Sequence, residues 1–211
     1  MKPVKLPISF IDYERLHRVM ATVLNSVDAH TAHACKFFAI AGAYILSETH
    51  GLEARPRFGS AFFRVDDKAD FVLAFTDMQA FQKGELRSHP EAFHAWIECN
   101  GVVIDLVAPL FRENLLSLRP DSPLRLPRKM FQKPLIQMAS SPFELTKEGD
   151  FYLAVNPAQT NEMIIDFMSR NMNKDLMKIC QYWYKPTPKP IQPELEMGSD
   201  DGARTLMRLE A

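Results

Sequence analysis

Residues 94–106 read HAWIECNGVVIDL and contain the clearest structural signal in the chain. Its centre, Asn100-Gly101, is a strong short-range signal for a β-hairpin, because a two-residue type I′ turn needs a positive φ angle at both central positions. We therefore expect two paired strands, Phe93–Cys99 and Val102–Val107, in a register that places Cys99 opposite Val102.

The two strands carry a histidine and an aspartate on the same face. Side chains alternate along a strand, so His94 and Asp105 become diagonal cross-strand neighbours with β-carbons about 7 Å apart or less. The aspartate can then accept a hydrogen bond from the imidazole, which a buried carboxylate requires. The alternative interpretation is that both residues lie incidentally on the solvent-facing side of a sheet.

Cys35 precedes a long apolar segment that predicts a buried helix. Thr31 is the expected N-cap of this helix, and Gly51 is the expected C-terminal stop. A thiol in the first turn lies near the positive end of the helix dipole, which favours the thiolate. The alternative is that Cys35 merely packs in the core, as most free cysteines do.

Charge and hydropathy exclude several classes of protein. The chain has 211 residues with 25 basic and 26 acidic side chains, which gives a net charge of −1 and argues against a nucleic-acid partner. No stretch approaches the roughly 20 apolar residues of a membrane span. The N-terminus lacks the apolar region of a secretory signal, and three cysteines without framework spacing favour reduced thiols. We therefore expect a cytoplasmic protein.

The remaining segments predict an α+β protein. Ser9 is the expected N-cap of a first amphipathic helix that serves only for packing. Two antiparallel strands are expected near 57–65 and 70–77, a polar loop at 78–90, a short helix at 109–118 and an irregular segment at 119–134. A strand near 148–155 and a helical region at 157–184, broken near 171–173, should follow. We expect one domain at 1–184 and, at 185–211, a Pro-rich linker with a weakly ordered polar tail.

A metal site is a further alternative. His30 and His33 lie just before Cys35, and together with His94 they would offer nitrogen and sulfur ligands. Their spacing matches no common zinc signature, so we expect neither a metal nor another cofactor.

The order of these features resembles the transglutaminase-like branch of the papain-like cysteine enzymes, and the chain looks most like the uncharacterised bacterial members. In that branch a nucleophile helix precedes an "ARxxxG" stretch and then "HAWxE…D". This sequence has Ala54-Arg55 with Gly59, then His94–Glu98 and then Asp105. The match covers about 31–109. It implies a papain-like core in which a buried nucleophile helix packs on an antiparallel β-sheet, with extra helices.

The resemblance also implies a role for each of three residues. Cys35 would be the nucleophile, His94 the general base and Asp105 the residue that orients His94. Backbone N–H of Cys35 is one candidate oxyanion donor, with Asn25 or His33 as the second. The sequence departs from the family pattern beside the nucleophile, where Ala34 and Lys36 replace the usual Gly or Trp.

Three hypotheses for the function follow. The first is a Cys-His-Asp hydrolase or acyltransferase that acts on a small-molecule or peptide amide, or a thioester, through an acyl-enzyme thioester. The second is a binding or scaffolding module with a silent triad, and the third is a metal-binding protein. No membrane or nucleic-acid partner is expected, and the helix near 163–183 and the tail are candidates for a homo-oligomer interface.

Overall fold

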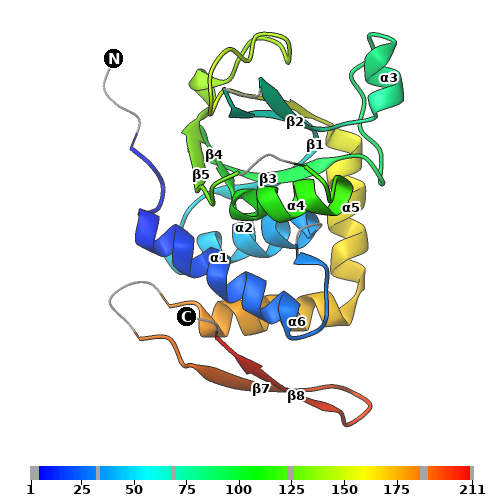
Figure 1. The fold of residues 1–211 in the computed structure, drawn as a ribbon. Coiled ribbons are helices and arrows are strands. Elements are labelled where there is room, and N and C mark those ends of the chain that lie inside the picture. Colours follow the sequence, from blue (N-terminus) through cyan, green and yellow to red (C-terminus); the bar gives the residue numbers. More distant parts are fainter. Residues whose placement is uncertain (1–4, 32–33, 68–69, 123–125, 186–189, 210–211) are drawn as a thin grey trace.

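A computed structural model describes residues 5–31, 34–67, 70–122, 126–185 and 190–209. The fold is mixed α+β, with a curled antiparallel sheet and several helices around it (Figure 1). The sheet has the strand order β2-β1-β3-β4-β5, and β6 pairs with β1 outside this path. Its strands are β1 (Ala54–Asp66), β2 (Phe71–Phe75), β3 (His94–Cys99), β4 (Val102–Asp105), β5 (Phe131–Pro134) and β6 (Phe151–Val155).

Helices cover this sheet, and a separate hairpin follows them in the chain. The helices are α1 (Phe10–Asn25), α2 (Cys35–His50), α3 (Met78–Gln82), α4 (Phe111–Leu118), α5 (Pro157–Ser169) and α6 (Asn171–Trp183). Short 3₁₀ segments among the described residues include η2 (Ala108–Leu110) and η3 (Leu135–Gln137). The hairpin consists of β7 (Glu194–Gly198) and β8 (Arg204–Arg208), and it lies below α1 and α6 in Figure 1.

The central hairpin forms as the Asn-Gly pair predicts. Asn100 and Gly101 have φ angles of 50° and 74°, and Cys99 pairs with Val102. β4 ends at Asp105, earlier than expected, because the next two residues turn into η2. Both strands are buried along nearly their whole length, so neither face of this hairpin is the solvent-facing side of the sheet.

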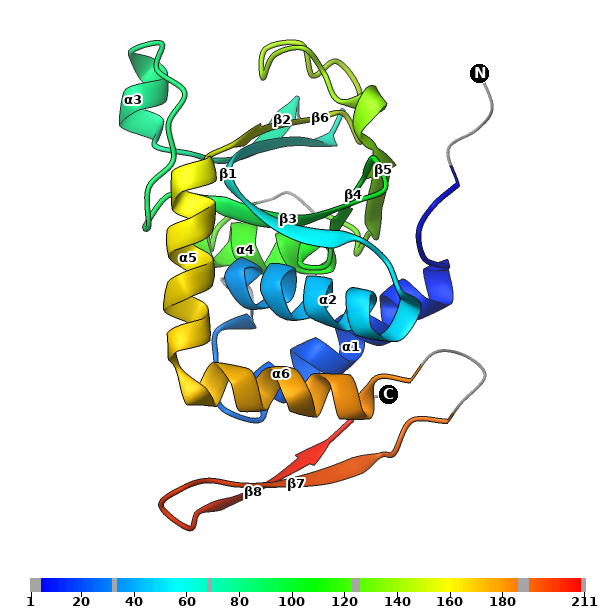
Figure 2. The same ribbon diagram turned by 180° about the vertical axis from the view of Figure 1, so that it is seen from behind.

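The buried helix α2 packs directly on β3 (Figure 2). Gly42 permits this approach, because a β-carbon there would lie 2.5 Å from Cδ1 of Leu106 and 2.9 Å from Cδ1 of Ile97. Gly51 ends the helix in the left-handed conformation, as expected. The predicted Thr31 cap is wrong: the helix begins at Cys35, after Ala34, and has no side-chain cap. Cys35 is therefore its first residue.

Helix α1 does more than pack. Its predicted N-cap is confirmed, since the Ser9 hydroxyl accepts from the backbone N–H of Asp12 at 3.1 Å. In addition, the Tyr13 hydroxyl donates to the backbone carbonyl of Asp105, and Nδ1–H of His17 donates to that of Leu106 at 2.8 Å. Two buried side chains of α1 thus hold the end of β4, so the expectation of a packing role alone is incomplete.

Three segments differ from the sequence-based expectation. The predicted 78–90 loop contains α3, whose first turn is capped by the Asp77 carboxylate. The predicted irregular segment 119–134 ends in β5, which pairs with β4. The tail forms the β7–β8 hairpin, with Met207 fully buried and β8 against α1. α3 depends on a short capped turn, whereas β5 and the β7–β8 hairpin depend on partners that are distant in the sequence.

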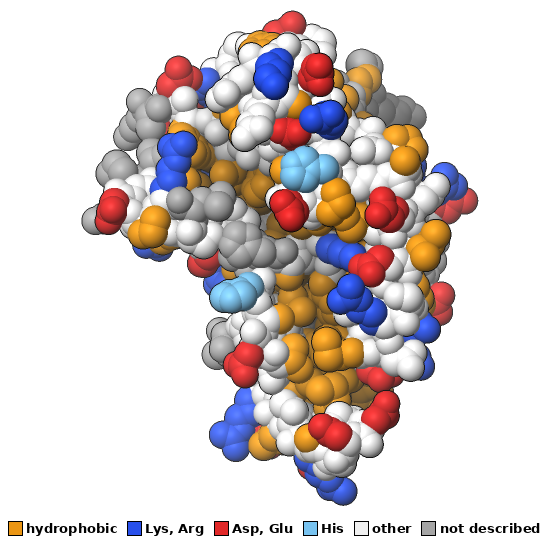
Figure 3. Space-filling view, turned by 90° about the vertical axis from the view of Figure 1, so that its right-hand side faces the viewer, with side chains coloured by type: hydrophobic (Ala, Val, Ile, Leu, Met, Phe, Trp, Pro, Cys, Tyr) orange, Lys and Arg blue, Asp and Glu red, His pale blue; other side chains and the backbone are white. Residues whose placement is uncertain are grey.

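Other elements agree with the prediction. The strand pair β1–β2 is antiparallel, although Lys68 and Ala69 of the expected turn lie outside the described residues. β6 and the two-part helical region are also present, with the break at Arg170. None of the helices in the described ranges is long and apolar enough to span a bilayer. Hydrophobic side chains nevertheless gather on the lower half of the face shown in Figure 3.

Candidate active site

His94 and Asp105 form a buried pair at the ends of β3 and β4. Nε2 of His94 lies 2.7 Å from Oδ2 of Asp105, and each side chain is 1% exposed. The other carboxylate oxygen of Asp105 accepts from the backbone N–H of Val107 at 3.0 Å. The pair is therefore not an incidental feature of a solvent-facing side. The carboxylate instead fixes which ring nitrogen of His94 carries a hydrogen toward it.

The environment of His94 favours the charged imidazolium. Burial disfavours the charged form and lowers the pKa, but the Asp105 carboxylate and Cys35 outweigh burial and raise the pKa from 6.5 to about 10. Nδ1 of His94 is buried and has no nitrogen or oxygen partner among the described residues, while Cys35 is close enough to raise the pKa of the imidazole. With Nε2 directed to Asp105, Nδ1 is the nitrogen left to exchange a proton with another group.

Aromatic rings enclose the imidazole. Phe75 stacks on it at a centroid distance of 4.4 Å, while Phe63 meets it edge-on at 5.5 Å and Phe111 at 6.0 Å. Stacking on a ring face also favours a cation. These rings come from β2, β1 and α4, so three separate elements restrict how the imidazole can turn.

Cys35 and His94 line the same cavity, which has a volume of about 380 Å³. Cys35 is buried, with 9% of its surface exposed. It is the first residue of α2, where the helix dipole favours an anion. The wall also includes Thr76 and Asn114 as polar residues. Asp105 lies behind His94 and does not line this cavity. The thiol and the imidazole thus line one cavity, and the carboxylate contacts the imidazole without lining that cavity.

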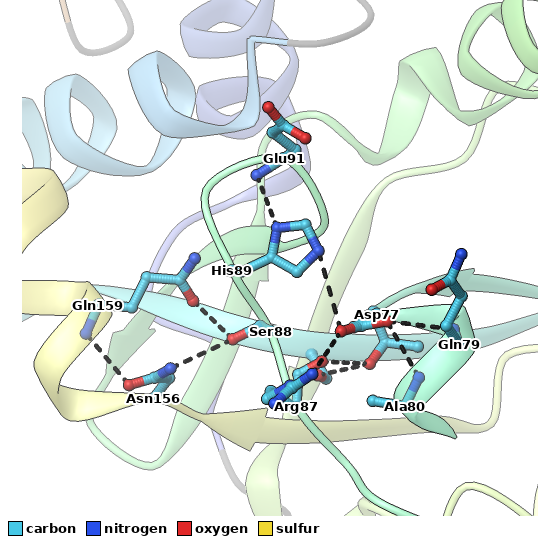
Figure 4. A network of polar contacts seen from close by, with 11 residues as sticks. Asp77, Gln79, Ala80, Arg87, Ser88, His89, Glu91, Asn156 and Gln159 are labelled. Atoms are coloured by element: carbon cyan, nitrogen blue, oxygen red, sulfur yellow. Dashed lines mark hydrogen bonds and ion pairs between the residues drawn. The ribbon is translucent and has the colours of Figure 1, made fainter. Parts of the chain in front are cut away.

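A polar network fixes the segment that borders the cavity (Figure 4). The Asp77 carboxylate accepts from Arg87 at 3.2 Å and from the N–H groups of Gln79 and Ala80. The Ser88 hydroxyl donates to Oε1 of Gln159 at 2.5 Å, which ties the segment to α5. Pro90 to Phe93, which follow directly, line the cavity. The segment predicted as a loop at 78–90 begins with α3 and reaches the candidate site at Pro90.

The remaining predicted residues do not join the site. Cys99 and Cys180 are buried elsewhere, and burial raises the pKa of each thiol. Asn25, proposed as an oxyanion donor, is exposed and does not line the cavity. His33, the other suggestion, lies outside the described residues. In the described ranges, no three His, Cys, Asp or Glu side chains are grouped to hold a metal ion.

Sequence reasoning missed Asn114, Thr76 and the aromatic residues around His94. Asn114 is 7% exposed and lies in the middle of α4, where its spacing gives no signal of a site. Thr76 follows β2 and donates its hydroxyl hydrogen to the backbone carbonyl of Arg87 at 2.9 Å. Only the tertiary arrangement brings these residues to Cys35 and His94.

Comparison with known proteins identifies a family without assigning an activity. No curated protein matches the chain. A solved structure titled "The crystal structure of genomics APC5867" is 30% identical in sequence and superposes with a TM-score of 0.84. The match covers 100% of this chain and 97% of the other chain. A family model matches residues 9–211 and therefore includes the C-terminal hairpin. The chain belongs to the family described as "Protein of unknown function (DUF2026)".

Proposed function

We propose that this protein is a Cys-His-Asp thiol enzyme, a hydrolase or acyltransferase that acts on an amide or thioester. The observation that carries the proposal is the state of His94. Asp105 binds its Nε2, its buried Nδ1 has no nitrogen or oxygen partner in the described chain, and Cys35 shares its cavity and raises its pKa.

The proposed reaction uses Cys35 as the nucleophile. Its thiolate attacks the acyl carbon, and a C–S bond forms as the carbonyl electrons move to oxygen. The C–N or C–S bond to the leaving group then breaks, and Nδ1–H of His94 protonates that group. In the second half, His94 takes a proton from water or an amine, which attacks the thioester carbon. The C–S bond breaks, and the Cys35 thiolate is regenerated.

Two groups are suited to stabilise the oxyanion. The backbone N–H of Cys35 is at the N-terminus of α2, where amides have no intrahelical partner. The side-chain amide of Asn114 is on the wall of the same cavity. We assign the second donor to Asn114 in place of Asn25 or His33. Preorganised donors of this kind stabilise the charge that develops in the transition state.

The finer fold assignment is part of the same proposal. A nucleophile helix buried against an antiparallel sheet, followed by a histidine and an aspartate on adjacent strands, is the arrangement of a papain-like, transglutaminase-like core. The order α2, β1, β3, β4 in this chain supports that assignment. We further propose a small-molecule or peptide amide as the substrate class.

Trapping of the acyl-enzyme tests the proposed function. Purified protein is mixed with 4-nitrophenyl acetate, quenched in acid and analysed by intact and peptide mass spectrometry. We expect an acetyl adduct on Cys35 in the wild type and none in Cys35→Ala, while His94→Gln slows its formation by about 10²-fold or more. A wild-type protein that forms no Cys35 adduct would be a binding module with a silent triad, and the enzyme proposal would fail.

A further inference from the structure

A second cavity lies next to the candidate active site but does not include Cys35 or His94. Its volume is about 170 Å³. Phe63 and Phe111, which contact the imidazole of His94, also line this cavity. Their ring centroids are 5.0 Å apart. The two rings are thus a wall that this cavity shares with the surroundings of His94.

The lining of the second cavity is mainly apolar. Besides the two shared rings, Val65, Met130 and Phe131 contribute to it. An apolar cavity of about 150 Å³ is large enough to take a benzene ring. The size and the aromatic lining therefore suit one small apolar body, such as a single ring or a short branched chain.

Lys133 lines this cavity and forms no ion pair with another described residue. Arg64 pairs with Asp67 and Asp70, and Lys129 pairs with Glu148. The ammonium of Lys133, in contrast, donates to the backbone carbonyl of Gly149 at 2.6 Å. No carboxylate in the described ranges lies within ion-pair distance of it.

The position of Lys133 explains why a ligand would be favoured there. Burial lowers the pKa of Lys133, so its charge is incompletely solvated. Asp150, whose charge acts to raise the pKa of Lys133, also lines the cavity and is engaged by the N–H groups of Thr146 and Lys147. An ammonium has three donors, and one carbonyl uses only one of them. An anionic oxygen would satisfy the others.

We propose that this cavity is a binding site for a small carboxylic acid with an apolar body. The carboxylate would pair with Lys133, and the apolar body would pack against Phe63 and Phe111. The site is distinct from the proposed catalytic cavity, and binding there does not depend on the activity of Cys35.

Calorimetric titration with phenylacetate tests this proposal, and phenylacetamide serves as the neutral ligand of the same shape. For the wild-type protein we expect saturable phenylacetate binding with a dissociation constant below about 1 mM, and at least about tenfold weaker binding of phenylacetamide. This comparison needs no variant and so does not depend on whether a substitution folds.

Two variants and one control locate the ligand. Lys133→Met keeps the aliphatic stem and should weaken phenylacetate binding about tenfold or more. Lys147→Met removes an exposed charge nearby and should leave binding unchanged. Ala108→Leu, which fills the cavity, should abolish binding of both ligands, with its fold checked by circular dichroism. The proposal is overturned if the wild type does not bind phenylacetate or binds phenylacetamide equally well. It is also overturned if Lys133→Met binds phenylacetate as tightly as the wild type does.

Discussion

Phe75 stacks on the imidazole of His94 with their ring centroids 4.4 Å apart and their planes at 24°. Phe75 covers one face of the imidazole and leaves the ring edge accessible to polar groups. Asp105 forms a hydrogen bond with the ring, and Cys35 raises its pKa. Asp105 fixes Nε2 of His94 by a hydrogen bond, and Phe75 restricts the rotation of the His94 side chain. The reactivity proposed for Cys35 therefore depends on a residue that performs no chemistry itself.

The first prediction concerns Phe75 as a positioning residue. Phe75→Leu keeps an apolar side chain but removes the stacking face, so we expect Cys35 alkylation near neutral pH to slow by about three- to tenfold. The rise in alkylation rate should move to higher pH, because the imidazolium of His94 loses a favourable contact. Phe71→Leu, on the same strand, is the matched control and should retain wild-type rates. Equal rates in both variants would contradict a positioning role.

The second prediction concerns stability as a function of pH. The pKa of His94 is raised from 6.5 to about 10 in the folded state, because Asp105 and Cys35 outweigh the opposing effect of burial. The folded protein therefore binds this proton more tightly than the unfolded chain does. The resulting stabilisation is fully present below pH 6.5 and is lost as the pH rises through about 10.

Urea denaturation of the wild type and His94→Gln at several pH values measures this effect. The difference in unfolding free energy between the two proteins should shrink as the pH rises from 6.5 toward 10. Subtracting the variant removes the contribution of groups that titrate in both proteins. A difference that stays constant over this range would mean that His94 does not bind its proton more tightly in the folded state.

The third prediction separates the oxyanion donor from the nucleophile. Asn114→Ala should slow acylation by 4-nitrophenyl acetate by about 10²-fold, because that reaction develops an oxyanion. Alkylation of Cys35 by iodoacetamide forms no oxyanion and should proceed at the wild-type rate. If both reactions slow equally, Asn114 supports the fold of the site, and the donor must be sought elsewhere.

The fourth prediction concerns the link between α1 and β4. Tyr13→Phe removes the hydroxyl that donates to the Asp105 carbonyl, and it leaves a buried acceptor without that bond. We expect a loss of about 1–3 kcal/mol in unfolding free energy, measured by urea denaturation. Tyr44→Phe is the control, since its hydroxyl donates to Gln181 at a part-buried site. A loss no larger than that of the control would contradict the proposed anchoring of β4.

The sequence predicts best where the determinants are local. The Asn100-Gly101 turn sets the register of the hairpin, and this register brings His94 to Asp105. The apolar run after Cys35 likewise predicts a buried helix that ends at Gly51. Both features need only neighbouring residues or a fixed side-chain period.

Prediction fails where distant segments meet. β5 gains its strand character by pairing with β4, which lies far away in the sequence, and its Pro-rich surroundings gave no hint of this. The C-terminal hairpin is anchored by Met207, whose burial depends on contacts outside the hairpin. Asn114 and Phe75 reach the candidate site only because α4 and β2 fold beside Cys35 and His94. No local pattern could identify them.

The most direct test is the pH dependence of Cys35 alkylation by iodoacetamide, followed by peptide mass spectrometry in the wild type and His94→Ala. Buried Cys99 and Cys180 are internal controls for unfolding. We predict that Cys35 is alkylated much faster than a free thiol near pH 7 and that His94→Ala abolishes this reactivity. If Cys35 reacts no faster than a free thiol near pH 7, or if His94→Ala has no effect, the proposed thiol enzyme is contradicted.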